Sequence, residues 1–320
     1  MKTFIRAVEY WVPTADRTSL AHGGGWYGDA PSFGAYSAKL CFGLGEGLPG
    51  QAWLQGHPIV LRQFEGSYFQ RTEAAHDAGL TCAIAIPLLS GDYLMAVVVM
   101  FCGDDAVHAG AIELWHNNPA DSADMSLADA YYGTTAEAFE YIARHVSFRR
   151  GTGLPGIVWD TGMPMFIDDL GRGQRFLRAS SATKVGINRG LAIPCANTGP
   201  DSWVLAFLSA LGTPLARRIE VWLPDAQRSE LQCVAGFCEL LGKLPASGVE
   251  GLGGAGDKPI ARGASTLGMT LVTGIPAISQ HAGDEPGELG ASARAAGLQV
   301  LLAMPLLNGG RLQAVIAWYF

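Results

Sequence analysis

One nine-residue pattern occurs three times in this chain, and it constrains the fold more than any other feature. Each copy reads Gly, an apolar residue, four further residues, Ala, an apolar residue and Pro, at 79–87, 186–194 and 297–305. The copies therefore begin 107 (186 − 79) and 111 (297 − 186) residues apart. A period near 110 is too long for a solenoid unit and suits a whole small domain. We expect three tandem domains of one topology.

Other marks run in phase with this period. We call the predicted domains the first repeat (1–107), the second repeat (108–214) and the third repeat (215–320). Each repeat opens on an apolar residue followed by Glu-x-Trp and closes on an apolar strand. The opening patterns are Val8–Trp11, Ile112–Trp115 and Ile219–Trp222. Landmarks that recur in the same order make chance similarity a poor explanation.

A longer pattern marks the middle of the first two repeats. Gly-Leu-Pro-Gly-x-x-Trp-x-x-Gly-x-Pro occupies Gly47–Pro58 and returns without a gap at Gly153–Pro164. The third repeat keeps only Gly268 and the Gly274-x-Pro276 end. The third repeat is therefore a degenerate copy.

These residues resemble the GAF domain family, small-molecule-sensing relatives of PAS domains. The most specific stretch is Gly45–Trp53, followed by Phe69-x-Arg71, and the second repeat carries the same landmarks from Gly151 to Phe207. The resemblance covers nearly the whole chain. It implies an α/β (α+β) fold in which each repeat is an antiparallel sheet with helices or loops on one face. It also implies a ligand pocket between the sheet and that layer.

Composition predicts a globular protein and excludes some partners. Hydrophobic residues make up 49% of the chain and charged residues 16%, which is enough apolar material for three small cores. A net charge of −7 argues against nucleic acid or an anionic membrane as partner. The longest apolar run, Tyr93–Phe101, is half of a membrane span, and Arg6 and Glu9 interrupt any signal peptide. We expect a cytoplasmic location.

The best candidates for ligand contacts precede the repeated Gly-Pro pattern. Phe69 and Arg71 lie ten and eight residues before it in the first repeat, and Phe176 and Arg178 do so in the second. An Arg at this place could hold an anionic ligand by paired hydrogen bonds. The alternative, which we favour, is that each Arg pairs with a nearby carboxylate and orders its loop.

Two tryptophans and a histidine complete the candidate set. Trp53 and Trp159 follow the Gly-Leu-Pro-Gly pattern, where a Trp either stacks on a ligand or anchors the turn to the core. His76 has no second ligand at a fixed spacing, so it gives weak support for a metal, and we expect none. In the third repeat, Gly287 and Leu289 stand in place of the Phe and the Arg, and Leu271 stands in place of the Trp.

Thiol chemistry is the enzymatic alternative. GAF-type free-methionine sulfoxide reductases use a Cys directly before a Gly in the turn that corresponds to 47–50. Pro49 and Pro155 stand at that place here, although Cys41 and Cys82 remain in the first repeat. The six cysteines form no Cys-x-x-Cys pair. No signature of cyclic-nucleotide binding or bilin attachment is present, and the sequence requires no cofactor.

These features predict a stand-alone sensor or adaptor that is not an enzyme. We expect it to bind a small molecule in the first or second repeat and to signal through a protein partner or a homo-oligomer. The alternatives are a thiol-dependent reductase and a ligand-free scaffold whose pockets are filled by side chains. The third repeat should lose its pocket. There the glycine-rich stretch Gly251–Gly256 replaces the apolar helix pattern of the second repeat, Ala138, Phe139, Ile142 and Val146.

The opening strands support a further expectation about surfaces. Strand alternation puts Glu and Trp of each Glu-x-Trp pattern on one face of the sheet and the aliphatic residues on the other. We expect the Trp face to be the outer face, with Trp11, Trp115 and Trp222 packed on one another, on linkers or on a second chain.

Overall fold

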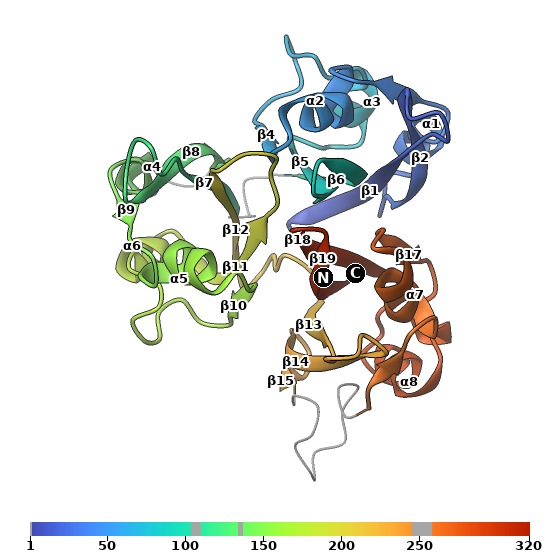
Figure 1. Cartoon of the computed structure of the whole chain (residues 1–320). Coiled ribbons are helices and arrows are strands. Elements are labelled where there is room, and N and C mark those ends of the chain that lie inside the picture. Colours follow the sequence, from blue (N-terminus) through green and yellow to red (C-terminus); the bar gives the residue numbers. More distant parts are fainter. Residues whose placement is uncertain (1, 104–109, 134–136, 245–257) are drawn as a thin grey trace. The chain divides into compact units, whose positions relative to one another are not determined.

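A computed structural model describes residues 2–103, 110–133, 137–244 and 258–320. It separates into two compact units, Met1–Leu215 and Ala216–Phe320. The first unit holds two six-stranded antiparallel sheets and the second holds one sheet of seven strands, each with a few short helices (Figure 1). The expected α+β fold class is confirmed. The three-domain division with boundaries at 107 and 214 stays a prediction.

The strands of the first unit form two sheets. The first sheet has the order β3-β2-β1-β6-β5-β4, with β1 Ile5–Pro13, β2 Ser19–Trp26, β3 Cys41–Gly43, β4 Ile59–Leu61, β5 Cys82–Ser90 and β6 Tyr93–Cys102. The second has the order β9-β8-β7-β12-β11-β10, with β7 Gly110–Asn117, β8 Met125–Tyr131, β9 Ser147–Phe148, β10 Met165–Ile167, β11 Ile187–Cys195 and β12 Ser202–Ala210.

The second unit repeats this order around one sheet. The order is β15-β14-β13-β19-β18-β17, with β16 also paired to β14. The strands are β13 Arg218–Pro224, β14 Glu230–Cys238, β15 Gly242–Leu244, β16 Ile260–Ala261, β17 Ala277–Ser279, β18 Leu301–Asn308 and β19 Arg311–Tyr319. Strand β16 precedes α7 and pairs with β14, as β3 precedes α2 and pairs with β2. It is therefore the counterpart of β3 and β9, and β15 is an additional strand of the third repeat.

Short helices follow the same plan in each repeat. In the first unit they are α1 Pro31–Ser37, α2 Gly47–Gln55, α3 Thr72–Asp77, α4 Glu137–Arg144, α5 Gly153–Thr161 and α6 Ala179–Lys184. In the second they are α7 Ser265–Thr273, the 3-10 turn η1 Ala282–Asp284 and α8 Gly287–Ala295. The repeated glycines at 79, 186 and 297 occupy equivalent places, because each lies just before the strand β5, β11 or β18 with a positive φ.

The Gly-Leu-Pro-Gly pattern is the first turn of a helix. Helices α2, α5 and α7 each end at a left-handed glycine, Gly56, Gly162 or Gly274, which is the usual helix C-cap. The second glycine of the pattern has a packing role. A Cβ at Gly50 would lie 2.1 Å from the carbonyl oxygen of Gly43, and one at Gly156 would lie 2.2 Å from that of Arg149. The helix can approach the preceding strand this closely only without a side chain.

Gly156→Ala should therefore lower the free energy of unfolding of the first unit by about 2–4 kcal/mol, because backbone must move to admit the methyl group. The measurement is urea unfolding of the full chain. Gly212→Ala is the matched control, since a Cβ there meets nothing within 4 Å. A change below about 0.5 kcal/mol for Gly156→Ala would contradict this packing account.

The three tryptophans of the opening strands lie inside the repeats. Trp11, Trp115 and Trp222 have no exposed area, and each belongs to the hydrophobic cluster of its own repeat. Trp11, for example, meets Phe42 edge-to-face at 4.7 Å between ring centroids. Glu and Trp do share one face as expected, but this face is covered by the helix layer. The expectation that these tryptophans form an outer interface is wrong.

The sequence also predicted an apolar helix in the second repeat and the loss of this helix in the third. Helix α4 forms in the second repeat, and it buries Phe139 and Ala143 while Ile142 is exposed, so the predicted apolar face is only partly correct. The glycine-rich stretch Gly251–Gly256 lies outside the described residues. Among the described residues, no helix is long and apolar enough to cross a membrane.

Candidate functional site

Each repeat buries the carboxylate of its opening Glu-x-Trp strand. We call Glu9, Glu113 and Glu220 the inner carboxylates; at most 1% of each is exposed. Glu and Trp project to the same side of the strand because they are two residues apart. The indole N–H of each Trp donates to the inner carboxylate two residues before it, at 2.9, 3.1 and 3.0 Å. A charge buried this deeply needs further partners.

In the first repeat, Arg71 supplies these partners. It ends the segment that enters α3, and its side chain turns inward over the sheet. Its Nη1 donates to Glu9 Oε2 at 2.8 Å and its Nη2 to Glu9 Oε1 at 2.6 Å, a bidentate pair. Nη1 also donates to the Ser37 hydroxyl, and the Tyr27 hydroxyl donates to Glu9 Oε2 at 3.1 Å. Each oxygen of Glu9 thus accepts two hydrogen bonds.

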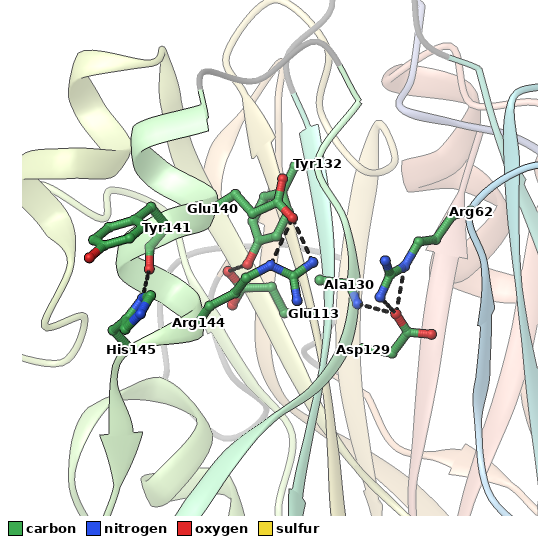
Figure 2. Close-up of polar contacts among 9 residues, drawn as sticks. All are labelled: Arg62, Glu113, Asp129, Ala130, Tyr132, Glu140, Tyr141, Arg144 and His145. Atoms are coloured by element: carbon green, nitrogen blue, oxygen red, sulfur yellow. Dashed lines mark hydrogen bonds and ion pairs between the residues drawn. The ribbon is translucent and has the colours of Figure 1, made fainter.

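The second repeat reproduces this arrangement with different residues in support. Arg178 Nη1 and Nη2 donate to Glu113 Oε1 and Oε2 at 2.7 and 2.6 Å. The hydroxyl of Tyr132, on the residue after β8, donates to Glu113 Oε1 at 2.9 Å, and Figure 2 shows it beside helix α4. Burial and the negative charge of Glu113 raise the pKa of Tyr132, so its hydroxyl keeps its proton and remains a donor.

Aromatic rings enclose both guanidinium groups. The centre of the Arg71 guanidinium lies 4.8 Å from the Phe33 ring centroid and 5.2 Å from that of Phe69, and Arg178 lies 5.0 Å from Phe139 and 5.1 Å from Phe176. Cation–π attraction of this kind strengthens when water is excluded. Phe69 and Phe176 therefore line a space that the guanidinium group of the arginine already fills.

The other predicted site residues lie on the helices α2, α3 and α5. Trp53 and Trp159 are on α2 and α5, partly buried against their clusters, and Arg150 lies 4.8 Å over the Trp159 ring. His76 is exposed on α3. Among the described residues, no three His, Cys, Asp or Glu side chains form a group that could hold a metal ion.

The third repeat keeps the inner carboxylate but changes its partners. Leu289 stands on α8 where the other repeats have their Arg, and it is buried in the core. Arg218 replaces the missing cation from the strand β13 itself, with Nη1 3.5 Å from Glu220 Oε1. The Tyr319 hydroxyl donates to Glu220 Oε2 at 3.2 Å. In the sequence, Arg218, Glu220 and Trp222 alternate along one strand and so share one face. This alternation was the signal that Arg218 replaces the missing cation.

A hollow of about 530 Å³ also lies in the third repeat, which was expected to have lost its pocket. It is formed by the start of α7, by β17 and by the segment that leads into α8. Glu285 is one of its lining residues, and its carboxylate accepts the backbone N–H of Thr266 at 2.9 Å. The lining includes Met269, Ile278 and His281.

No family model matches the chain, and no curated protein matches it. Solved structures do match, each over about a third of the chain, which is the length of one repeat. Several of the matched structures are GAF domains. The GAF domain of nlh2 from A. aeolicus in an inactive state is 19% identical at a TM-score of 0.26, covering 32% of this chain and 59% of its own. The GAF domain of a phosphoenolpyruvate-protein phosphotransferase from Coxiella burnetii is 18% identical at 0.26, covering 31% and 56%.

An enzyme is among the neighbours as well. A free methionine-R-sulfoxide reductase from Neisseria meningitidis, in complex with its substrate, is 16% identical at a TM-score of 0.25, covering 31% of this chain and 52% of its own. The chain thus spans a little over half the length of these neighbours. The neighbours thus include GAF domains and an enzyme, and the likeness assigns no activity.

Proposed function

We propose that this chain is a non-catalytic GAF-like adaptor, which acts through contacts with another protein and whose first two repeats are filled by their own side chains. The observation that carries the proposal is the bidentate pairing of Arg71 with Glu9 and of Arg178 with Glu113. The two Nη groups of each guanidinium already hold a buried carboxylate, so this end-on face is closed to an anionic ligand. For these two repeats the geometry thus supports the predicted alternative in which side chains fill the pockets, and it does not support a small-molecule site there.

The cysteines give the reductase alternative little support. Cys82 is fully buried on β5, and Cys41 is exposed on the short strand β3. Pro49 and Pro155, on the first turns of α2 and α5, occupy the position of the reactive cysteine in the GAF-type reductases. A proline offers no nucleophile.

We expect the full chain to reduce free methionine-R-sulfoxide no faster than a thiol reductant alone. The assay follows loss of the sulfoxide with dithiothreitol as the electron donor. Cys41→Ser and Cys82→Ser should leave this background rate unchanged. Turnover above background that either substitution abolishes would establish the enzyme and overturn the proposal.

A second candidate function is binding of a small molecule in the third repeat. The hollow beside α7 is favoured by its volume of about 530 Å³, within the usual range of ligand sites. Ligand-observed NMR with a fragment library tests it on the full chain. Binding signals that disappear in an Ile278→Trp variant, in which an indole fills the hollow, would support this candidate, and an absence of signals would remove it.

A further inference from the structure

The inner carboxylate of the third repeat is incompletely paired. Glu9 and Glu113 each accept four hydrogen bonds, two on each oxygen. Glu220 accepts two, from Trp222 and Tyr319, and both reach Oε2. Its Oε1 is buried without a hydrogen-bond partner. Unpaired buried acceptors are costly, so this carboxylate is held less favourably than its two counterparts.

Arg218 stands between two competing acceptors. Its Nη1 donates to the hydroxyl of Ser292, on α8, at 2.9 Å and lies 3.5 Å from Glu220 Oε1. Its Nε and Nη2 are buried without partners. The guanidinium thus bonds the helix layer, while Oε1 of the carboxylate beside it lacks a hydrogen-bond donor. A small movement would exchange one acceptor for the other.

The protonation state of Glu220 decides whether its Oε1 or the Ser292 hydroxyl is the stronger acceptor for Arg218. Burial raises the pKa of Glu220 above its ordinary value, against the opposing effect of the Arg218 charge. The other titratable groups that face it keep their protons, because burial raises the pKa of the Tyr319 hydroxyl and of the Cys233 thiol. The pKa of Glu220 is thus raised from the low value of a free glutamate, whereas the other two groups start from high pKa values that burial raises further.

We propose that Glu220 and Arg218 form a pH-sensitive switch in the unit Ala216–Phe320, which goes beyond the proposed adaptor function. While Glu220 is protonated, Arg218 bonds Ser292 and holds α8 on the sheet. Ionised Glu220 attracts the guanidinium to Oε1, and α8 loses its polar tie to β13.

The direction follows from proton linkage. A group with a raised pKa in the folded state contributes stability that is complete below its unfolded pKa and is lost as the pH rises through the folded pKa. The contact between α8 and the sheet should therefore weaken as the pH rises. The first two repeats, whose inner carboxylates are fully paired, should lack this response.

Hydrogen exchange of the full chain, followed by mass spectrometry from pH 5 to pH 9 and corrected for intrinsic rates, tests the switch. Opening of α8 should increase with pH, by up to about tenfold for each pH unit over which the Glu220 proton is released. Peptides from α6 serve as the internal reference and should not change. Glu220→Gln should make α8 exchange slow at every pH, and Glu230→Gln, on the neighbouring strand, should behave as the wild type.

Ser292→Ala decides the question even if Glu220→Gln fails to fold. Without the competing hydroxyl, Arg218 has no tie to α8 that a proton could release. Exchange of α8 should then be fast already at pH 5 and independent of pH. Wild-type exchange of α8 that does not vary with pH, or a pH dependence that persists in either variant, would overturn the proposal.

Discussion

Replacing Arg178 by Met is expected to destabilise the unit Met1–Leu215 by about 3–5 kcal/mol, because it leaves Glu113 buried without its cation. The carboxylate would keep only the hydrogen bonds from Trp115 and Tyr132. The arginine side chain is itself only 3% exposed, so water does not replace it at once. The measurement is urea unfolding of the full chain, followed by circular dichroism.

Two controls separate the lost pair from a lost side chain. Arg175→Met, on the same segment but exposed, should change stability by less than about 0.5 kcal/mol. The double variant Glu113→Gln with Arg178→Met removes both charges, and it should recover most of the loss, since a neutral pair of similar volume needs no counter-charge. A double variant as unstable as Arg178→Met alone would show that packing, and not charge pairing, dominates this site.

Trp115→Ala should cost a similar amount, about 3–5 kcal/mol, because it opens a large cavity in the core of the second repeat. It also removes the indole donor to Glu113 and the ring that meets Phe148 at 4.8 Å. Urea unfolding measures the loss, and light scattering measures the mass in solution. The mass should not change, because this tryptophan is an internal residue.

The same experiment distinguishes a core role from an interface role. A tryptophan at an interface between chains would, when truncated, change the mass in solution and leave unfolding of the unit nearly intact. Tyr141→Ala is the matched control, since Tyr141 is 65% exposed in the same repeat. Its effect on stability should stay below about 0.5 kcal/mol.

The sequence predicted the fold class because its landmarks recur in phase. Strand alternation in Val8–Trp11 correctly placed Glu9 and Trp11 on one face of β1. Alternation cannot say which face the helices cover, however, because the aliphatic residues opposite, such as Val8, are equally suited to burial. The error about the tryptophans arose there. A Glu between two apolar or aromatic residues and two positions before a Trp, repeated three times, was the signal that this face holds a buried carboxylate.

The partners of the inner carboxylates were harder to predict. Glu9 and Arg71 are 62 residues apart in the sequence, and only the fold brings them together. Spacing identified the Arg as unusual but could not choose between a ligand and a carboxylate as its partner. In the third repeat the loss of the Arg at Leu289 suggested a lost site. The replacement, Arg218, was visible two residues before Glu220, on the same face of the strand.

Native mass spectrometry of freshly purified full-length chain tests the central claim most directly, namely that the inner sites of the first two repeats are filled by their own Arg–Glu pairs. The wild type should carry no small molecule whose retention depends on these sites, so its ligand state should equal that of a variant with Glu9→Gln, Arg71→Met, Glu113→Gln and Arg178→Met. A bound small molecule that the wild type retains and this variant loses would contradict the account.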